Sequence, residues 1–166
     1  MDIAFDTLKI GLPLLAAVFA YFRFFREGTH KQRIQFDIEY RDLGIKDQKR
    51  LVEITVTAEN KGFVEHRFDD VRVTLRGISG KSPVEHIAKH PPRLAFPETD
   101  DALKKISLIP EKWGYFFVRP KILQRFPLVT AIPDDWTHLF VRTTFCYQQT
   151  GGIHSAERVF IASEQS

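Results

Sequence analysis

Two histidines and a glutamate form the pattern in this chain that comes closest to a metal site. Glu85, His86 and His90 read E-H-x-x-x-H. Histidines four residues apart lie on one face of a helix, and neutral imidazoles are good zinc ligands. A zinc protease, however, needs the order H-E-x-x-H, and the prolines at 91–92 end any helix there. A metal-dependent enzyme using both histidines stays open as an alternative to a solvated loop, with at most one helical turn over residues 83–89.

The other reactive side chains favour neither a catalytic site nor a cofactor site. Adjacent aspartates occur at 69–70, 100–101 and 134–135, beside turns and strand starts where aspartate caps the backbone. A calcium loop needs more oxygen ligands at regular spacing. The single cysteine, Cys146, has no visible base to activate its thiol. The chain also lacks a glycine-rich phosphate loop, a nucleophile elbow and a dinucleotide fingerprint. We therefore expect a protein that is not an enzyme and holds no cofactor.

The densest aromatic run lies at residues 113–118 and reads WGYFFV. Because side chains alternate along a strand, both faces of this segment are apolar. That pattern favours a central strand buried between two layers. The alternative is an exposed aromatic face that docks a partner or meets the membrane. The candidate docking residues are Trp113, Tyr115, Phe116 and Phe117.

The elements that position these residues follow a period of two rather than 3.6. Apolar and polar side chains alternate in the clearest stretches, as expected for half-buried strands, and turn residues separate the stretches. Residues 33–166 therefore predict one mainly β domain, an antiparallel sandwich. The expected strands are 34–41, 52–58, 71–76, 106–109, 114–119, 128–132, 137–147 and 155–162, with the last two joined across the turn at 150–152.

Residues 51–75, LVEITVTAENKGFVEHRFDDVRVTL, place an alternating strand, Asn-x-Gly, a short second strand and another alternating strand in succession. This order resembles the immunoglobulin-like β-sandwich repeats of adhesion and cell-envelope proteins. The resemblance implies a sandwich fold and no active site. One N-terminal apolar segment followed by one small β domain also resembles uncharacterised prokaryotic single-span membrane proteins, which implies no particular activity.

The N-terminal segment carries an uncharged apolar run, Ile10 to Phe22. Thirteen helical residues cover about 20 Å, against about 30 Å of bilayer hydrocarbon. Counting the flanks from Ile3 to Phe25 extends the helix to roughly 34 Å. We expect residues 1–26 to form a transmembrane helix with a short outside tip. A signal peptide and a core or interfacial helix are the rival interpretations, but the start is acidic and the run has no polar face.

Charge flanking the run predicts its orientation. The basic side chains after it indicate the cytoplasmic side. We therefore expect a single-pass protein of the cell (inner) membrane with its N-terminus outside. Residues 27–32 would form a juxtamembrane linker, and the C-terminal domain would be cytoplasmic. The residues expected to face lipid are Arg23, Arg26, Lys31 and Arg33. Residues 34–166 then hold 19 Lys and Arg against 18 Asp and Glu, a net charge of +1. Such a balance argues against a nucleic-acid partner.

Together these features predict a membrane-anchored, non-catalytic interaction module. Its partners would be the lipid bilayer and another protein, and it would act as an accessory, scaffold or sensor subunit. The alternatives are the metal-dependent enzyme using His86 and His90 and an outward-facing envelope or adhesion module. The second alternative arises because immunoglobulin-like repeats are mostly extracytoplasmic, whereas the charge pattern places this domain inside the cell.

Overall fold

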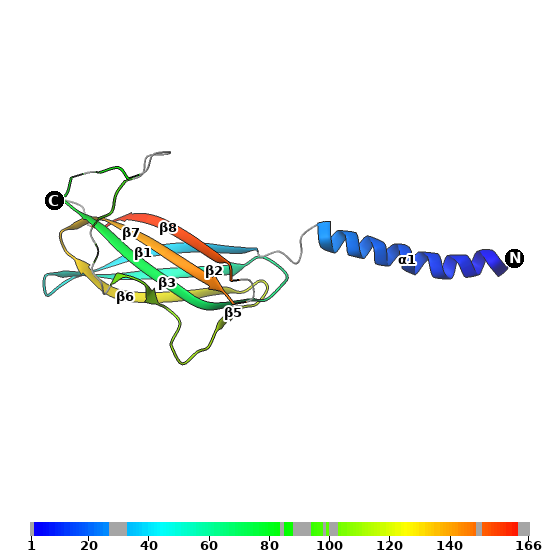
Figure 1. Cartoon of the computed structure of the whole chain (residues 1–166). Helices are drawn as coiled ribbons and strands as arrows, with labels where there is room; N and C mark the ends of the chain where they lie inside the picture. Colours follow the sequence, from blue (N-terminus) through cyan, green and yellow to red (C-terminus); the bar gives the residue numbers. More distant parts are fainter. Residues whose placement is uncertain are drawn as a thin grey trace.

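The structure is a computed structural model that describes residues 2–26, 33–83, 85–87, 94–97, 99, 103–148 and 151–162. After one N-terminal helix, α1 (Asp2–Arg26), the described chain is strands and connecting loops (Figure 1). All strand pairs are antiparallel. The domain is therefore mainly β, as the period of two predicts.

The strands form two sheets that pack face to face (Figure 1). A three-stranded sheet has the order β1-β2-β6, and a five-stranded sheet has the order β4-β3-β7-β8, with β5 also paired to β3. The three-stranded sheet consists of β1 (Ile34–Lys46), β2 (Lys49–Asn60) and β6 (Leu123–Pro133). The five-stranded sheet consists of β3 (His66–Ser79), β4 (Ile106–Ser107), β5 (Phe116–Val118), β7 (Trp136–Tyr147) and β8 (Ile153–Ile161).

The core lies between the two sheets and is built from one face of each alternating strand. Val52, Ile54 and Val56 of β2 point inward and are fully buried, as are Val71, Val73 and Leu75 of β3 and Leu139, Val141 and Phe145 of β7. Burying a side chain of this size contributes about 1.5–3 kcal/mol. Phe36 of β1 stacks on Phe145 with ring centroids 3.7 Å apart, which joins the edge of one sheet to the centre of the other.

The β1–β2 hairpin closes through a two-residue turn that has no glycine. Lys46 pairs with Lys49, and the intervening Asp47 and Gln48 have φ of 52° and 60°. Positive φ at both central residues is the type I′ geometry, whose twist matches that of the flanking strands. A bulge at residues 42–44, with Gly44 at φ 100°, shifts the register just before the turn.

Strand β6 extends through a proline that the sequence pattern treats as a break. The predicted strand begins at Leu128, but β6 starts at Leu123 and places Pro127 opposite Thr55. Because β6 pairs only with β2 among the described strands, one of its edges makes no ladder bonds. Proline is tolerated on such an edge, where its missing N–H is not needed.

Helix α1 shows why the predicted membrane span is wrong. Its described apolar side chains between Leu12 and Phe24 are exposed, but in the part of the chain that the structure describes no helix combines the length and apolarity needed to cross a membrane. The uncharged run covers only about 20 Å of the 30 Å required, and extending it brings in Asp6, Lys9 and Arg23. The predicted single-pass localisation in the inner membrane, with an outside N-terminus and a cytoplasmic domain, is therefore wrong.

Candidate functional site

The histidine pattern does not sit on a helix where it is described. His86 is exposed and forms an isolated antiparallel bridge with Leu94, so the expected helical turn is absent from residues 85–87. His90 lies outside the described residues. No group of three or more His, Cys, Asp or Glu side chains in the described parts of the chain is arranged to hold a metal ion. The metal hypothesis placed His86 on a helix, and this placement is wrong.

The aromatic run lies at an edge of the five-stranded sheet rather than at its centre. Strand β5 is three residues long and pairs with the start of β3, His66 opposite Val118 and Phe68 opposite Phe116. Trp113, Tyr115 and Phe117 are 52%, 42% and 40% exposed. The expectation of a strand buried on both faces is wrong, because the short segment has the core on one side only.

The inward side chains of β5 fasten it to the core. The ring of Phe116 packs edge-on to Phe126 at 4.8 Å between centroids and stacks parallel to Phe68 at 6.4 Å. Val118 is fully buried. The alternation along β5 thus places Phe116 and Val118 inward and Phe117 outward, and Tyr115, the residue before β5, is also exposed.

A buried asparagine holds this edge in place. Asn60, the last residue of β2, has no exposed surface, and its Nδ2 donates hydrogen bonds to the carbonyl oxygens of Val64 at 2.8 Å and Val118 at 2.9 Å. Its Oδ1 accepts a hydrogen bond from the N–H of Gly62 at 2.9 Å. The sequence indicates only a turn at Asn60-Lys61-Gly62, whereas the side chain links two sheets.

Cationic side chains lie against two of the outward aromatic rings, those of Tyr115 and Phe117. The guanidinium of Arg67 lies 5.0 Å from the ring centroid of Tyr115, and that of Arg119 lies 5.4 Å from the ring of Phe117. Glu65 bridges the two arginines, with Oε1 3.2 Å from Arg67 Nε and Oε2 3.7 Å from Arg119 Nε. We call Glu65, Arg67, Trp113, Tyr115, Phe117 and Arg119 the aromatic surface. Cation–π pairs of this kind contribute about 0.5–1 kcal/mol at exposed sites.

Buried titratable groups lie behind the aromatic surface. The imidazole of His66 is buried, and burial lowers its pKa below the ordinary 6.5. Its ring meets Tyr147 edge-on at 6.1 Å, and its Nε2 has no hydrogen-bond partner among the described residues. Burial raises the pKa of Tyr147 to about 12, and the Tyr147 hydroxyl shares a 3.0 Å hydrogen bond with His154 Nδ1. Both His66 and Tyr147 are therefore neutral at physiological pH.

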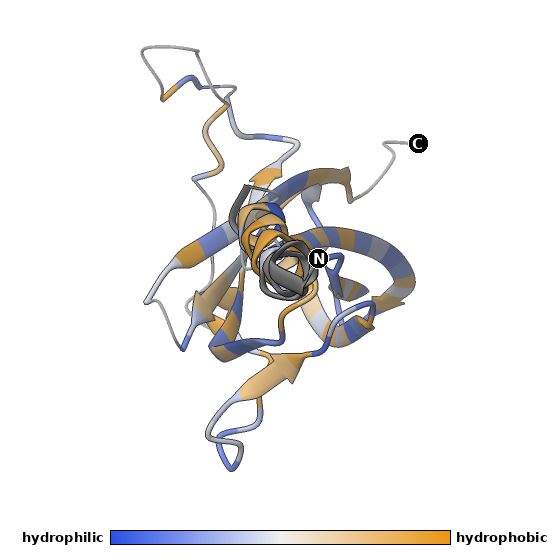
Figure 2. Ribbon diagram, turned by 90° about the vertical axis from the view of Figure 1, so that its right-hand side faces the viewer, coloured by the Kyte–Doolittle hydropathy of each residue, from blue (hydrophilic) through white to orange (hydrophobic). Residues whose placement is uncertain are grey.

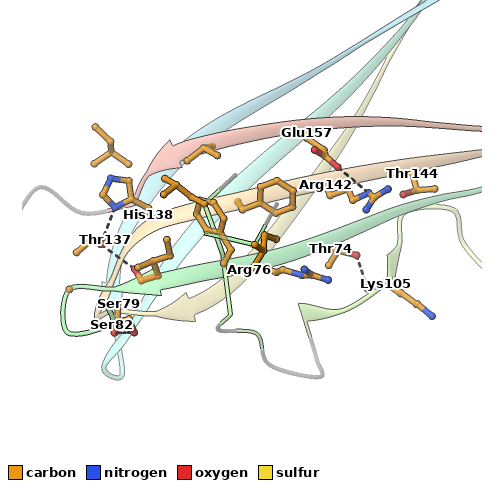
Figure 3. A pocket seen from close by; sticks show the side chains of 18 of the residues that line it. Thr74, Arg76, Ser79, Ser82, Lys105, Thr137, His138, Arg142, Thr144 and Glu157 are labelled. Atoms are coloured by element: carbon orange, nitrogen blue, oxygen red, sulfur yellow. Dashed lines mark hydrogen bonds and ion pairs between the residues drawn. The ribbon is translucent and has the colours of Figure 1, made fainter. Parts of the chain in front are cut away.

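A pocket of about 1560 Å³ lies on the outer face of the five-stranded sheet (Figure 3). At its rim Thr137 Oγ1 lies 3.0 Å from His138 Nδ1, a distance at which a base could activate a hydroxyl. Thr137 Oγ1, however, donates to the carbonyl oxygen of Ile78 at 3.1 Å. A threonine hydroxyl has one proton, so it accepts from His138 and is not activated by it. This pair does not favour catalysis.

The basic residues after the apolar run are only partly within the described structure. Arg23 lies in α1, and the carbonyl oxygen of Arg33 accepts a hydrogen bond from the N–H of Lys61 at 2.8 Å, just before β1. The Arg26 side chain and all of Lys31 lie outside the described residues. Lipid contact by these four residues stays a prediction.

Comparison with known proteins identifies no family. No protein-family model matches the chain, and no curated protein matches it. The chain is similar to an X-ray structure of a Northeast Structural Genomics Consortium target, with 11% identity over 78% of this chain and 85% of the other and a TM-score of 0.47.

Two further solved structures are similar. The putative ApaA protein from Bordetella pertussis shares 11% identity over 81% of this chain and 97% of its own, with a TM-score of 0.47. The sporulation control protein Spo0M from Bacillus subtilis shares 15% identity over 78% of this chain, with a TM-score of 0.43. The match spans 50% of the Spo0M chain.

Proposed function

We propose that this domain is a non-catalytic interaction module that binds another protein through the aromatic surface. The observation that carries the proposal is the exposure of Phe117, in an edge strand that is anchored from within, together with that of Trp113 and Tyr115 in the segment just before this strand. Tryptophan, tyrosine and arginine are the residues most enriched where protein partners bind tightly. An edge fixed by Asn60 loses little conformational entropy on binding, because it is already ordered.

The charges of the aromatic surface indicate the chemistry of the partner. Two arginines stand against one glutamate, so the surface carries one excess positive charge. A guanidinium stacked on a ring keeps its donors available for carboxylates. The partner segment would therefore combine an apolar or aromatic side chain with one or more acidic residues.

We also propose that the sandwich is immunoglobulin-like. The chain crosses from one sheet to the other between consecutive strands, because β2 is followed by β3 and β6 is followed by β7. In sandwiches of this class the loops cluster at the two ends, and in variable domains the loops of one end form the binding site. The aromatic surface lies beside the β2–β3 connection, at such an end.

The test compares capture of a partner by the full chain and by surface variants. Replacing Tyr115 and Phe117 together by serine is expected to lower affinity at least tenfold with an unchanged melting temperature, because both rings are exposed. The matched control is Val129→Ser, an exposed apolar position on β6 of the other sheet. Equal capture by wild type and the double variant would contradict the proposal.

A further inference from the structure

The outer face of the five-stranded sheet is charged at one end and apolar at the other. Antiparallel sheets usually show a polar face to water, but here only one end of the face is polar. Three consecutive rows cross β3, β7 and β8, each row directly paired in register. The rows are Thr74–Arg142–Glu157, then Arg76–Phe140–Val159, then Ile78–His138–Ile161.

A chain segment lies over the apolar half and turns the face into a pocket. Residues 85–87 and 94–97 run antiparallel, with the N–H of Ala95 donating to the carbonyl oxygen of Glu85 at 2.8 Å. The ring of Phe96 packs on Phe140 at 5.3 Å between centroids. Ile87 and Leu94 also line the pocket, although both are exposed to solvent. The volume of about 1560 Å³ exceeds the 300–1,000 Å³ typical of small-ligand sites.

The charged half has a clear excess of positive charge. Four cationic side chains line the pocket against the single carboxylate of Glu157: Arg72, Arg76, Lys105 and Arg142. Arg142 is paired with Glu157 at 3.4 Å, and Arg72 is paired with Asp70. Arg76 and the Lys105 ammonium make no ion pair within the described part of the chain. Figure 3 shows Arg76, Arg142 and Lys105 on one side of the pocket, with Thr137 and His138 on the other.

We propose that this pocket binds a long-chain carboxylate, with its head at Arg76 and Lys105 and its tail over Phe140, Val159 and Ile161. A guanidinium presents paired donors that match a carboxylate, and removing the apolar tail from water favours binding in proportion to the area buried. The floor is a sheet face, whose backbone groups are already bonded in the ladder. A peptide laid there would bury its own N–H and C=O groups without partners, whereas an alkyl tail has none.

The experiment is calorimetric titration of the full chain with sodium dodecanoate below its micelle-forming concentration. Dodecanoate is expected to bind, and acetate and dodecyltrimethylammonium are not, because both halves of the ligand are needed. Arg76→Gln is expected to weaken binding at least tenfold, and Val159→Trp, which fills the apolar half, is expected to abolish it. The matched control is Arg125→Gln, an exposed arginine on β6 outside the pocket, which should bind as wild type does.

Several results would overturn the assignment. Equal binding of the cationic amphiphile would show that the head group is not recognised. Unchanged dodecanoate binding by both Arg76→Gln and Val159→Trp would place the ligand elsewhere, including on the exposed side chains of α1. Tight binding of an acidic peptide in place of dodecanoate would assign the pocket to a protein. Thermal melting of each variant tests whether the fold is intact. Arg76→Gln is expected to fold normally, because it alters a side chain on the exposed face of β3.

Discussion

The side-chain amide of Asn60 donates to the backbone carbonyl of Val118 across 2.9 Å, and this contact joins the last residue of β2 to the edge strand β5. Through it the three-stranded sheet holds the aromatic edge of the five-stranded sheet. Figure 2, which looks along the sandwich from the end near α1, shows apolar and polar residues alternating along the strands. The exposure of the aromatic surface thus depends on a buried polar side chain in the other sheet.

Replacing Asn60 is expected to destabilise the domain substantially. Asn60→Ala leaves the carbonyl oxygens of Val64 and Val118 and the N–H of Gly62 without their side-chain partner. Each unsatisfied buried group costs about 1–3 kcal/mol, so with three groups affected the free energy of unfolding, measured by urea titration, should fall by at least about 3 kcal/mol. Asn60→Asp should do at least as badly, because it sets a carboxylate oxygen against two carbonyls. If Asn60→Asp left the free energy of unfolding nearly unchanged, the amide would not be the anchor.

A glycine on β3 makes room for the buried indole of β7. A Cβ built at Gly77 would lie 2.0 Å from Cδ2 of Trp136, whose side chain is buried. Gly77→Ala must displace the indole, and overpacking of this kind costs about 1–3 kcal/mol. Chemical denaturation measures the loss. Gly114→Ala, where nothing lies within 4 Å of the added carbon, is the control and should change stability by less than about 0.5 kcal/mol.

The turn of the first hairpin should be improvable. Gln48 has φ of 60°, a region in which L-residues other than glycine pay about 1–2 kcal/mol. Gln48→Gly creates the Asp-Gly pair that type I′ turns prefer, so stability should rise by about 0.5 kcal/mol or more after the entropy cost of glycine. Lys49→Gly, one residue further along in β2, should instead lose about 0.5–1 kcal/mol. A destabilised Gln48→Gly variant would contradict the turn geometry.

Buried His66 should make stability depend on pH in a defined direction. Burial lowers its pKa in the folded state below 6.5, the unfolded value, so the unfolded chain binds the proton more tightly. The free energy of unfolding is therefore undiminished above pH 6.5 and falls as the pH drops from 6.5 through the folded-state pKa. His66→Phe should remove this part of the pH dependence while keeping an aromatic ring against Tyr147. Parallel unfolding curves at several pH values measure it; identical slopes for both proteins would refute the effect.

Much of the fold was predictable because local alternation reports burial directly. The strands expected at 34–41, 52–58, 71–76 and 137–147 all lie within β1, β2, β3 and β7, and the final hairpin is present as β7–β8. These segments have one face in the core, so their period of two survives in the sequence.

The remaining features depend on contacts between distant residues. The aromatic run at 113–118 is apolar on both faces, but only its pairing with β3 shows which face is covered. Asp47 and Gln48 carry no glycine signal, although both have positive φ in a two-residue turn. The pocket on the outer face arises from rows across three strands, a register that no local pattern reveals. The membrane prediction was wrong because it extended a short apolar run through charged flanks.

The most direct test of the interaction module is site-specific photo-crosslinking within intact cells of the source organism. A photoreactive phenylalanine analogue at Phe117 reports what touches the aromatic surface, and the same analogue at the exposed Val129 of β6 is the matched control. We expect one discrete protein adduct from position 117, none from position 129, and loss of that adduct when Arg67 and Arg119 are both replaced by glutamate. No adduct at position 117, or equal adducts at both positions, would contradict the account.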